Sequence, residues 1–233
     1  MSYILQGVKK GILLIFSLND EVLIILKLSL FVSTVATLIA IVIGVPLGSI
    51  IAIKKFPLKK LAITLTNTAM GLPPVVVGLV VALILSRNSP LGFLGWLYTP
   101  KGMIVAQVII ATPIITGLSQ AAVQAVDPRF YQQILALGAT TLQALCILLK
   151  EIRLSVLAAI IAGFGSIISE VGAVMMVGGN IKGQTRVLTT ATVLETQMGN
   201  FDMAIALGII LLTMSFIVNL ALTYIQQGRV KRL

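Results

Sequence analysis

Five long stretches of the chain are almost continuously apolar, and short polar segments separate them. They cover about residues 22–53, 61–86, 102–126, 154–177 and 203–225. Each exceeds the roughly 18 residues that a helix needs to cross a bilayer. None alternates between apolar and polar positions over about ten residues, as a transmembrane β-barrel strand does. The pattern therefore predicts an all-α fold, a polytopic membrane bundle of five transmembrane helices in a single domain, residues 1–233.

The prolines of the first two stretches bear on the shape of their helices. The first stretch is longer than a perpendicular span needs, and Pro46 allows it to kink. Pro73 and Pro74 remove two backbone donors in the second stretch and prevent a straight helix. Irregular backbone at membrane depth is tolerated only against protein or a water-filled path. The paired prolines therefore indicate either a kink that lines a pore or a kink that serves packing.

The segment before the first apolar stretch has a different pattern, because its apolar residues fall roughly on one helical face. These residues are Ile4, Leu5, Val8, Ile12, Ile15 and Phe16. Lys9 and Lys10 lie mostly off that face. We expect residues 4–18 to form an amphipathic helix that lies in the membrane surface. The alternative is a sixth transmembrane span.

Basic residues are distributed unevenly among the connecting segments. The chain has 17 basic and 7 acidic residues and a net charge of +10. The loops at 54–60 and 127–153 and the C-terminal tail carry more Lys and Arg than the segments between them. The positive-inside rule therefore predicts a multi-pass protein of the cell membrane, with its N-terminus outside and its C-terminus in the cytoplasm. Anionic membrane lipid accounts for the basic balance better than nucleic acid, because aromatic residues do not interleave the basic ones.

Residue types that carry catalysis are scarce. The sequence has no His and a single Cys, Cys146. This composition excludes disulfides within the chain, zinc or haem sites, and Cys–His nucleophiles. A phosphate-binding Gly-x-x-x-x-Gly-Lys-Ser/Thr motif is also missing from the sequence. We therefore expect no catalytic residues, no metal site and no cofactor in this chain, which disfavours a membrane-embedded enzyme.

The segment at residues 127–153 is long for a connection between spans. Its first part has helical composition as far as Leu137, and Gly138 can supply a left-handed helix stop. Thr140 or Thr141 can then cap a second helix. The pattern predicts two short helices joined at a glycine, a rigid knob suited to pushing against another protein. A plain amphipathic connector is the alternative.

This segment resembles the coupling motif of ABC importer permeases. The resemblance lies in Gln132-Gln133-Ile134-Leu135-Ala136-Leu137-Gly138-Ala139. The family has a Glu-Ala-Ala triplet followed three residues on by Gly, whereas Gln132, Gln133 and Ile134 stand at the triplet here. The sequence also departs from the motif at residues 148–151. The resemblance implies that Gln132, Gln133, Leu137, Gly138 and Ala139 form a cytoplasmic coupling loop that docks on a separate ATPase subunit.

Two further segments strengthen this resemblance. Residues 71–79, Gly-Leu-Pro-Pro-Val-Val-Val-Gly-Leu, and residues 169–185 look like the molybdate, tungstate and sulfate branch of these permeases. With residues 186–191, Arg-Val-Leu-Thr-Thr-Ala, they are most similar to tungstate permeases. The resemblance implies an ABC importer permease of the type I fold and a homodimer with two ATPase subunits that bind ATP and Mg. It also implies an extracytoplasmic binding protein that delivers an oxyanion. Tungstate is favoured, and molybdate or sulfate stays possible.

Polar residues inside or beside the apolar stretches are the candidate path residues. For the translocation path or gate they are Asn67, Pro73, Pro74, Glu170 and Gly172. Carboxylates are costly in a membrane and usually face the protein interior or a cavity. Glu170 fits a gate or its packing better than contact with an anion, because like charges repel. It is simply solvated if it lies nearer the outer interface. Asn67 either lines the path or bonds across helices. Gly163, Gly165 and Gly172 would allow close helix approach.

The outer mouth is assigned to the segment after the fourth stretch. Its candidate residues are Asn180, Lys182, Gln184, Thr185 and Arg186. Lys182 and Arg186 either attract an oxyanion electrostatically or are ordinary solvated loop charges.

A secondary transporter of a small anion is the competing function. It would favour inverted repeats and paired ionisable groups in the membrane. Only Lys27 and Glu170 are ionisable residues within the apolar stretches.

Overall fold

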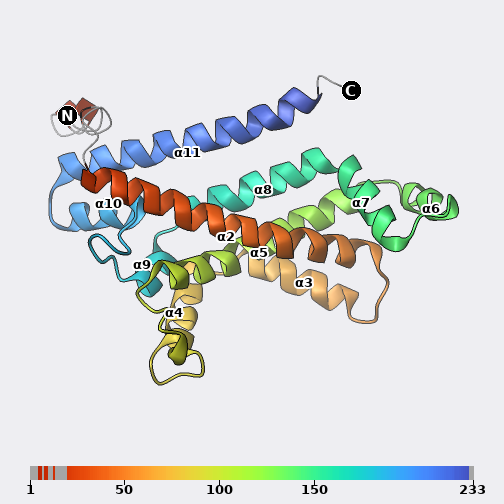
Figure 1. Ribbon diagram of the computed structural model, residues 1–233, viewed down its shortest axis with the longest axis horizontal. Helices are drawn as coiled ribbons and strands as arrows, with labels where there is room; N and C mark the ends of the chain where they lie inside the picture. Colours follow the sequence, from red (N-terminus) through yellow and green to blue (C-terminus); the bar gives the residue numbers. More distant parts are fainter. Residues whose placement is uncertain (1–4, 7, 10–12, 14–19, 231–233) are drawn as a thin grey trace. The chain divides into compact units, whose positions relative to one another are not determined.

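All regular elements of the described residues are helices in the computed structural model of the chain (Figure 1). The structure describes residues 20–230 and, before them, residues 5, 6, 8, 9 and 13. The expected surface helix at 4–18 therefore lies for the most part outside the described residues. The predicted all-α fold class is confirmed.

The helices follow one another as α2 (Asp20–Ile53), α3 (Lys59–Met70), α4 (Pro74–Leu85), the 3₁₀ helix η1 (Gly92–Leu94), α5 (Pro100–Gln124), α6 (Pro128–Ala136), α7 (Thr141–Glu151), α8 (Arg153–Ile168), α9 (Gly172–Gly178), α10 (Leu188–Gln197) and α11 (Phe201–Val230).

Three of these helices, α2, α5 and α11, are each long and apolar enough to cross a membrane. The pairs α3 with α4 and α8 with α9 also satisfy this criterion, each pair taken together across a short break. The described residues thus hold up to five spans. The break between α3 and α4 falls at the paired prolines, as the sequence predicts, and Pro74 occupies the first turn of α4.

The fourth apolar stretch differs from its prediction. Residues 154–177 read as one continuous helix, whereas α8 ends at Ile168 and α9 begins at Gly172. Glu170 therefore lies in a break between two helices and not inside one. The cause lies in hydrogen bonds from residues distant in sequence, described with the site below.

The chain divides into two compact units. The first unit comprises Met1–Ala36, Pro73–Gln107 and Gly165–Ala221. The second unit comprises Thr37–Leu72, Val108–Phe164 and Leu222–Leu233. Each unit is described by itself.

In the first unit, α4 and α9 pack side by side (Figure 1). The contact is close because a Cβ at Gly78 of α4 would stand 2.5 Å from the Cα of Ala173 in α9. Val32, Met103, Val174 and Val187 form a buried apolar cluster. This cluster joins α2, α5 and α9 to the chain leading into α10.

In the second unit, glycines bring α2 against α5. A Cβ at Gly48 would stand 2.9 Å from the backbone nitrogen of Gln120 and would also collide with the carbonyl of Thr116. Gly163 of α8 likewise faces Ile115, since a Cβ at Gly163 would stand 2.8 Å from Cγ1 of that side chain. The expected close approach is confirmed for Gly163 and Gly172. A Cβ at Gly165 would meet nothing within 4 Å among the described residues, so Gly165 makes no close approach within one chain.

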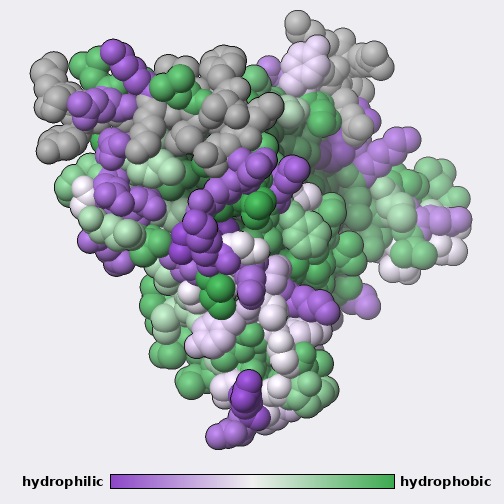
Figure 2. Space-filling view, turned by 60° about the vertical axis from the view of Figure 1, so that its left-hand side comes forward, coloured by the Kyte–Doolittle hydropathy of each residue, from purple (hydrophilic) through white to green (hydrophobic). Residues whose placement is uncertain are grey.

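The surface of the chain is rich in apolar side chains, as expected for helices in lipid. Figure 2 shows hydrophobic residues over much of one face, with hydrophilic residues gathered towards its middle. Exposed large apolar residues are frequent on α2, α4 and α11. Apolar surface of this extent in water would mark an interaction site, so a bilayer or a partner chain must cover it.

The α2–α5 contact gives a stability prediction. We expect Gly48→Ala to lower the free energy of unfolding by about 2 kcal/mol, because backbone atoms of α5 have to move to admit the methyl group. The melting temperature of the purified chain in mild detergent should fall by roughly 4–8 °C.

Gly165→Ala is the matched control, since the same methyl group enters open space in α8. Its melting temperature should stay unchanged or rise slightly. Equal melting temperatures for the two variants would contradict the described packing of α2 on α5.

Candidate functional site

Glu170 caps α9 from the break between α8 and α9. Its carboxylate Oε1 accepts a hydrogen bond from the backbone N–H of Ala173 at 3.1 Å. Its backbone carbonyl accepts a second one from the hydroxyl of Thr189 at 3.0 Å. A carboxylate at a helix N-terminus is stabilised by the free N–H groups there. The described contacts thus give Glu170 a positioning role for the break.

Three polar side chains lie around this break, and two of them, Ser29 and Gln107, were missed by the sequence analysis. A narrow cavity beside Glu170 is lined in part by Ser29 of α2, Gln107 of α5 and Thr189 of α10. The Nε2 of Gln107 donates to the carbonyl of Ile167, at 3.1 Å, near the end of α8. The hydroxyl of Ser29 donates to the carbonyl of Ile25 and accepts from the N–H of Leu188, at 2.9 Å.

One atom of this polar cluster lacks a protein partner. The Oε1 of Gln107 is buried and makes no hydrogen bond with any described residue. A sequence signal for the cluster existed on α2, where Ser29 and Ser33 are four residues apart and both buried. That spacing places both on one face of a helix otherwise rich in apolar residues.

The predicted path residues fall in both units. Val75 of α4 packs against Gly172, so the turn at Pro73 and Pro74 lies next to the break that holds Glu170. Asn67 belongs to α3 in the second unit and is exposed. The structure therefore brings Pro73, Pro74, Glu170 and Gly172 into one neighbourhood within the first unit.

The predicted outer-mouth segment is an ordered turn between α9 and α10. The buried hydroxyl of Thr185 donates to the carbonyl of Gly178 at 2.6 Å and accepts from the N–H of Ile181 at 2.9 Å. The Nε of Arg186 donates to Oδ1 of Asn180 at 3.3 Å. Gln184 is exposed. Thr185 and Asn180 thus hold the turn in shape.

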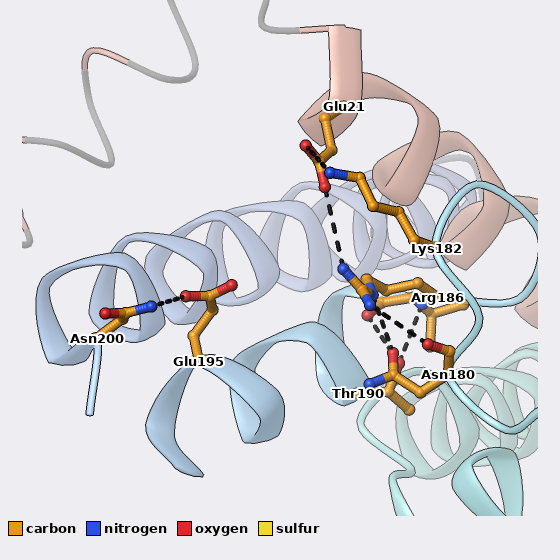
Figure 3. A network of polar contacts seen from close by, with 8 residues as sticks. Glu21, Asn180, Lys182, Arg186, Thr190, Glu195 and Asn200 are labelled. Atoms are coloured by element: carbon orange, nitrogen blue, oxygen red, sulfur yellow. Dashed lines mark hydrogen bonds and ion pairs between the residues drawn. The ribbon is translucent and has the colours of Figure 1, made fainter. Parts of the chain in front are cut away.

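The two basic residues of this turn share a carboxylate (Figure 3). Lys182 Nζ lies 2.9 Å from Oε2 of Glu21, and Arg186 Nη1 lies 4.0 Å from its Oε1. Glu21, in the first turn of α2, was missed by the sequence analysis. The charged side chains that line the adjoining cleft of about 190 Å³ are thus two cations and one anion.

The segment at 127–153 forms the predicted pair of helices. Asp127 caps α6, since its Oδ1 accepts the N–H of Arg129 at 2.8 Å. Gly138 follows α6 with a φ of +90°, the left-handed stop expected there. Thr140 caps α7 in a capping box with Gln143. The local prediction, helix–glycine–helix, is confirmed.

The base of this hairpin is fixed and its tip is exposed. Val123, Leu148 and Ile152 form a buried cluster that holds α7 against the end of α5. At the tip, Leu137 is 88% exposed and Leu142 is 71% exposed. Gln132 and Gln133 are exposed on α6, and Ala139 is half-buried after Gly138. Exposed leucines on a rigid support are typical of a surface that a partner covers.

Among the residues that the structure describes, no group of three or more acidic or thiol side chains is placed to hold a metal ion.

Comparison with known proteins gives a family match over most of the chain. Residues 44–231 match the model of the family described as binding-protein-dependent transport system inner membrane component. The chain is 41% identical to the tungstate uptake system permease protein of Peptoclostridium acidaminophilum, over 97% of this chain and all of that protein. It is 33% identical to the protein of the same description from Campylobacter jejuni, over 94% of this chain and 92% of the relative.

A solved structure shares the fold. The chain matches a crystal form of the MetNI methionine ABC transporter in an inward-facing conformation, with a TM-score of 0.75. The match covers 89% of this chain and 95% of the other at 17% identity. The predicted bundle of the ABC importer permease type is thus confirmed.

The role of Glu170 as a helix cap gives a second prediction. Glu170→Ala removes the acceptor for the N–H of Ala173, and we expect the melting temperature of the purified chain to fall by roughly 2–4 °C, the effect of about 1 kcal/mol. Glu170→Gln keeps an acceptor oxygen and should change the melting temperature little.

The control is Glu195→Ala, which removes a carboxylate whose hydrogen bond to Asn200 is exposed. An equal loss in Glu170→Gln and Glu170→Ala would mean that the negative charge, and not the acceptor, holds the break.

Proposed function

Because this chain belongs to the family of binding-protein-dependent transport system inner membrane components, we propose that two copies of it form the membrane path of an ABC importer for an oxyanion, tungstate foremost. The identity with tungstate uptake permeases along nearly the whole chain carries the choice of substrate. Molybdate and sulfate are the other candidates.

Family membership establishes the coarser statements directly. The chain is a multi-pass membrane permease component of a transport system, and it works with an ATPase and a substrate-binding protein. It is not an enzyme, and it is not the secondary transporter considered from the sequence.

The surface of α3 supports the homodimer. None of its residues is buried in the chain, all of them being described. Thr64, Asn67 and Thr68 are exposed on a helix that belongs to an apolar stretch. Polar side chains at membrane depth face protein or water rather than lipid. A second copy that encloses a water-filled path along α3 satisfies this requirement.

The distribution of basic residues supports the orientation. With the N-terminus outside and the C-terminus in the cytoplasm, the α6–α7 hairpin lies on the cytoplasmic side and the turn at 178–187 outside. The hairpin then meets the ATPase subunits, two per dimer, which bind ATP and Mg. This chain lacks the phosphate-binding motif that such binding needs.

Transport follows from these placements. When ATP closes the ATPase pair, each α6–α7 hairpin moves with its subunit and the path opens outward. The binding protein releases the oxyanion at the outer mouth, where Lys182 and Arg186 outnumber the single carboxylate of Glu21 and attract an anion. Hydrolysis returns the pair to the inward-open state. The break at Glu170 and the turn at Pro73 and Pro74 line or gate the path.

Uptake into vesicles tests the function. We expect tungstate to accumulate only when the chain is reconstituted with its ATPase, its binding protein and ATP. An ionophore that collapses ion gradients should leave the rate unchanged. Accumulation driven by an ion gradient would contradict the proposal. So would a failure of all three oxyanions, tungstate, molybdate and sulfate, to accumulate.

The coupling role of the α6–α7 hairpin gives a further prediction. Gly138→Val forces a side chain into a φ of +90° and should distort the tip of the hairpin. We expect at least a tenfold loss of ATP-driven uptake and of co-purified ATPase subunit.

Gly199→Val is the matched control. Gly199 has a φ of +79°, also follows a helix, and also has open space around its Cβ position. The Gly199→Val variant should have the same local backbone strain and still co-purify with the ATPase subunit. An equal loss in both variants would show that strain in general, and not the hairpin, uncouples the complex.

A further inference from the structure

An apolar groove in the second unit ends at a single arginine. It has a volume of about 370 Å³, and its lining residues are Ile41, Val45, Leu149, Arg153, Val156, Leu157, Ile160 and Ile225. Seven of these eight side chains are aliphatic, and they come from α2, α7, α8 and α11. The volume falls in the range of roughly 300–1,000 Å³ that is typical of small-molecule sites.

The arginine lacks a partner among the described residues. No carboxylate of these residues lies within ion-pair distance of Arg153, and none of their hydrogen bonds involves its guanidinium. It is the first residue of α8 and is only partly exposed. A partly buried cation beside an apolar wall calls for an anionic group on whatever fills the groove.

The groove is a built feature of the second unit. The Nε2 of Gln226 in α11 donates to the carbonyl of Leu154 at 3.1 Å. This bond joins α11 to the first turn of α8, next to Arg153, and so fixes one wall at the charged end. The aliphatic residues on α2 and α8 lie within the apolar stretches, so the groove faces the hydrocarbon of the membrane.

We propose that this groove binds one anionic phospholipid, with its phosphate on Arg153 and an acyl chain along Val156, Leu157 and Ile160. On the orientation proposed above, Arg153 lies at the cytoplasmic leaflet, where anionic lipids gather. The guanidinium matches a phosphate through two parallel hydrogen bonds.

Other occupants fit less well. A free oxyanion would meet one donor group and an otherwise aliphatic wall. A second copy placed across a two-fold axis would need an acidic residue in the same groove. None of the seven acidic residues of the sequence lines it.

Native mass spectrometry of the chain, purified in mild detergent with its co-purifying subunits, tests the site. The probes are phosphatidylglycerol and phosphatidylcholine with identical acyl chains. We expect the wild type to retain phosphatidylglycerol in preference. Arg153→Gln should weaken that binding about fivefold, the factor for about 1 kcal/mol per basic side chain at an anionic surface. It should leave phosphatidylcholine unaffected, and Arg153→Lys should keep most of the preference.

Lys150→Gln is the matched control, because it removes one positive charge from an exposed residue outside the groove. A similar loss in this variant would mean diffuse attraction to the basic surface and would overturn the proposal. Equal binding of the two lipids by the wild type would do the same.

If Arg153→Gln does not fold, Ile160→Trp fills the groove without changing charge. It should displace both lipids, and unchanged phosphatidylglycerol binding in that variant would also overturn the proposal.

Discussion

Every backbone polar group at membrane depth needs a hydrogen-bond partner. This requirement shapes the two breaks within apolar stretches, between α3 and α4 and between α8 and α9. At the first break, Pro73 and Pro74 have no N–H to satisfy, and the carbonyl of Pro73 accepts the N–H groups of Val76 and Val77. At the second break, Glu170 and Thr189 supply the missing partners. Side chains of the first unit thus hold the irregular backbone at the second break.

The same unit connects the breaks to the outer turn. Thr189, which bonds the carbonyl of Glu170, stands only a few residues after Arg186, whose side chain bonds Asn180. An ion pair between Lys182 and Glu21 also joins this outer turn to α2. Short, directional hydrogen bonds therefore lie on both sides of the few residues that separate the outer turn from the break. In the second unit, the hairpin with the exposed Leu137 is joined just as firmly at its base, by Leu148 and its neighbours.

Local signals made part of this predictable from sequence. The glycine stop at Gly138 and the cap at Thr140 act within a few residues of the helices that they end or begin. The α6–α7 hairpin could therefore be predicted from the sequence. The break at Glu170 could not, because apolar residues flank it on both sides. Thr189, which bonds the carbonyl of Glu170, lies 19 residues away in the sequence. Gln107, which bonds the carbonyl of Ile167, lies 60 residues from it. Glu21 was missed for the same reason. The homodimer and the binding of ATP by its partner subunits are proposals that rest on the family.

The central claim is that the polar side of α3 meets a water-filled path, and cysteine accessibility at position 67 tests it most directly. Asn67→Cys would be made in a Cys146→Ser background, since Cys146 is exposed. A membrane-impermeant thiol reagent would then be applied to vesicles that hold the complete transporter, with Leu65→Cys as the apolar neighbour. The account predicts that residue 67 reacts, at a rate that changes with ATP and falls with tungstate, while residue 65 does not react. A residue 67 that stays unreactive in every state would contradict it.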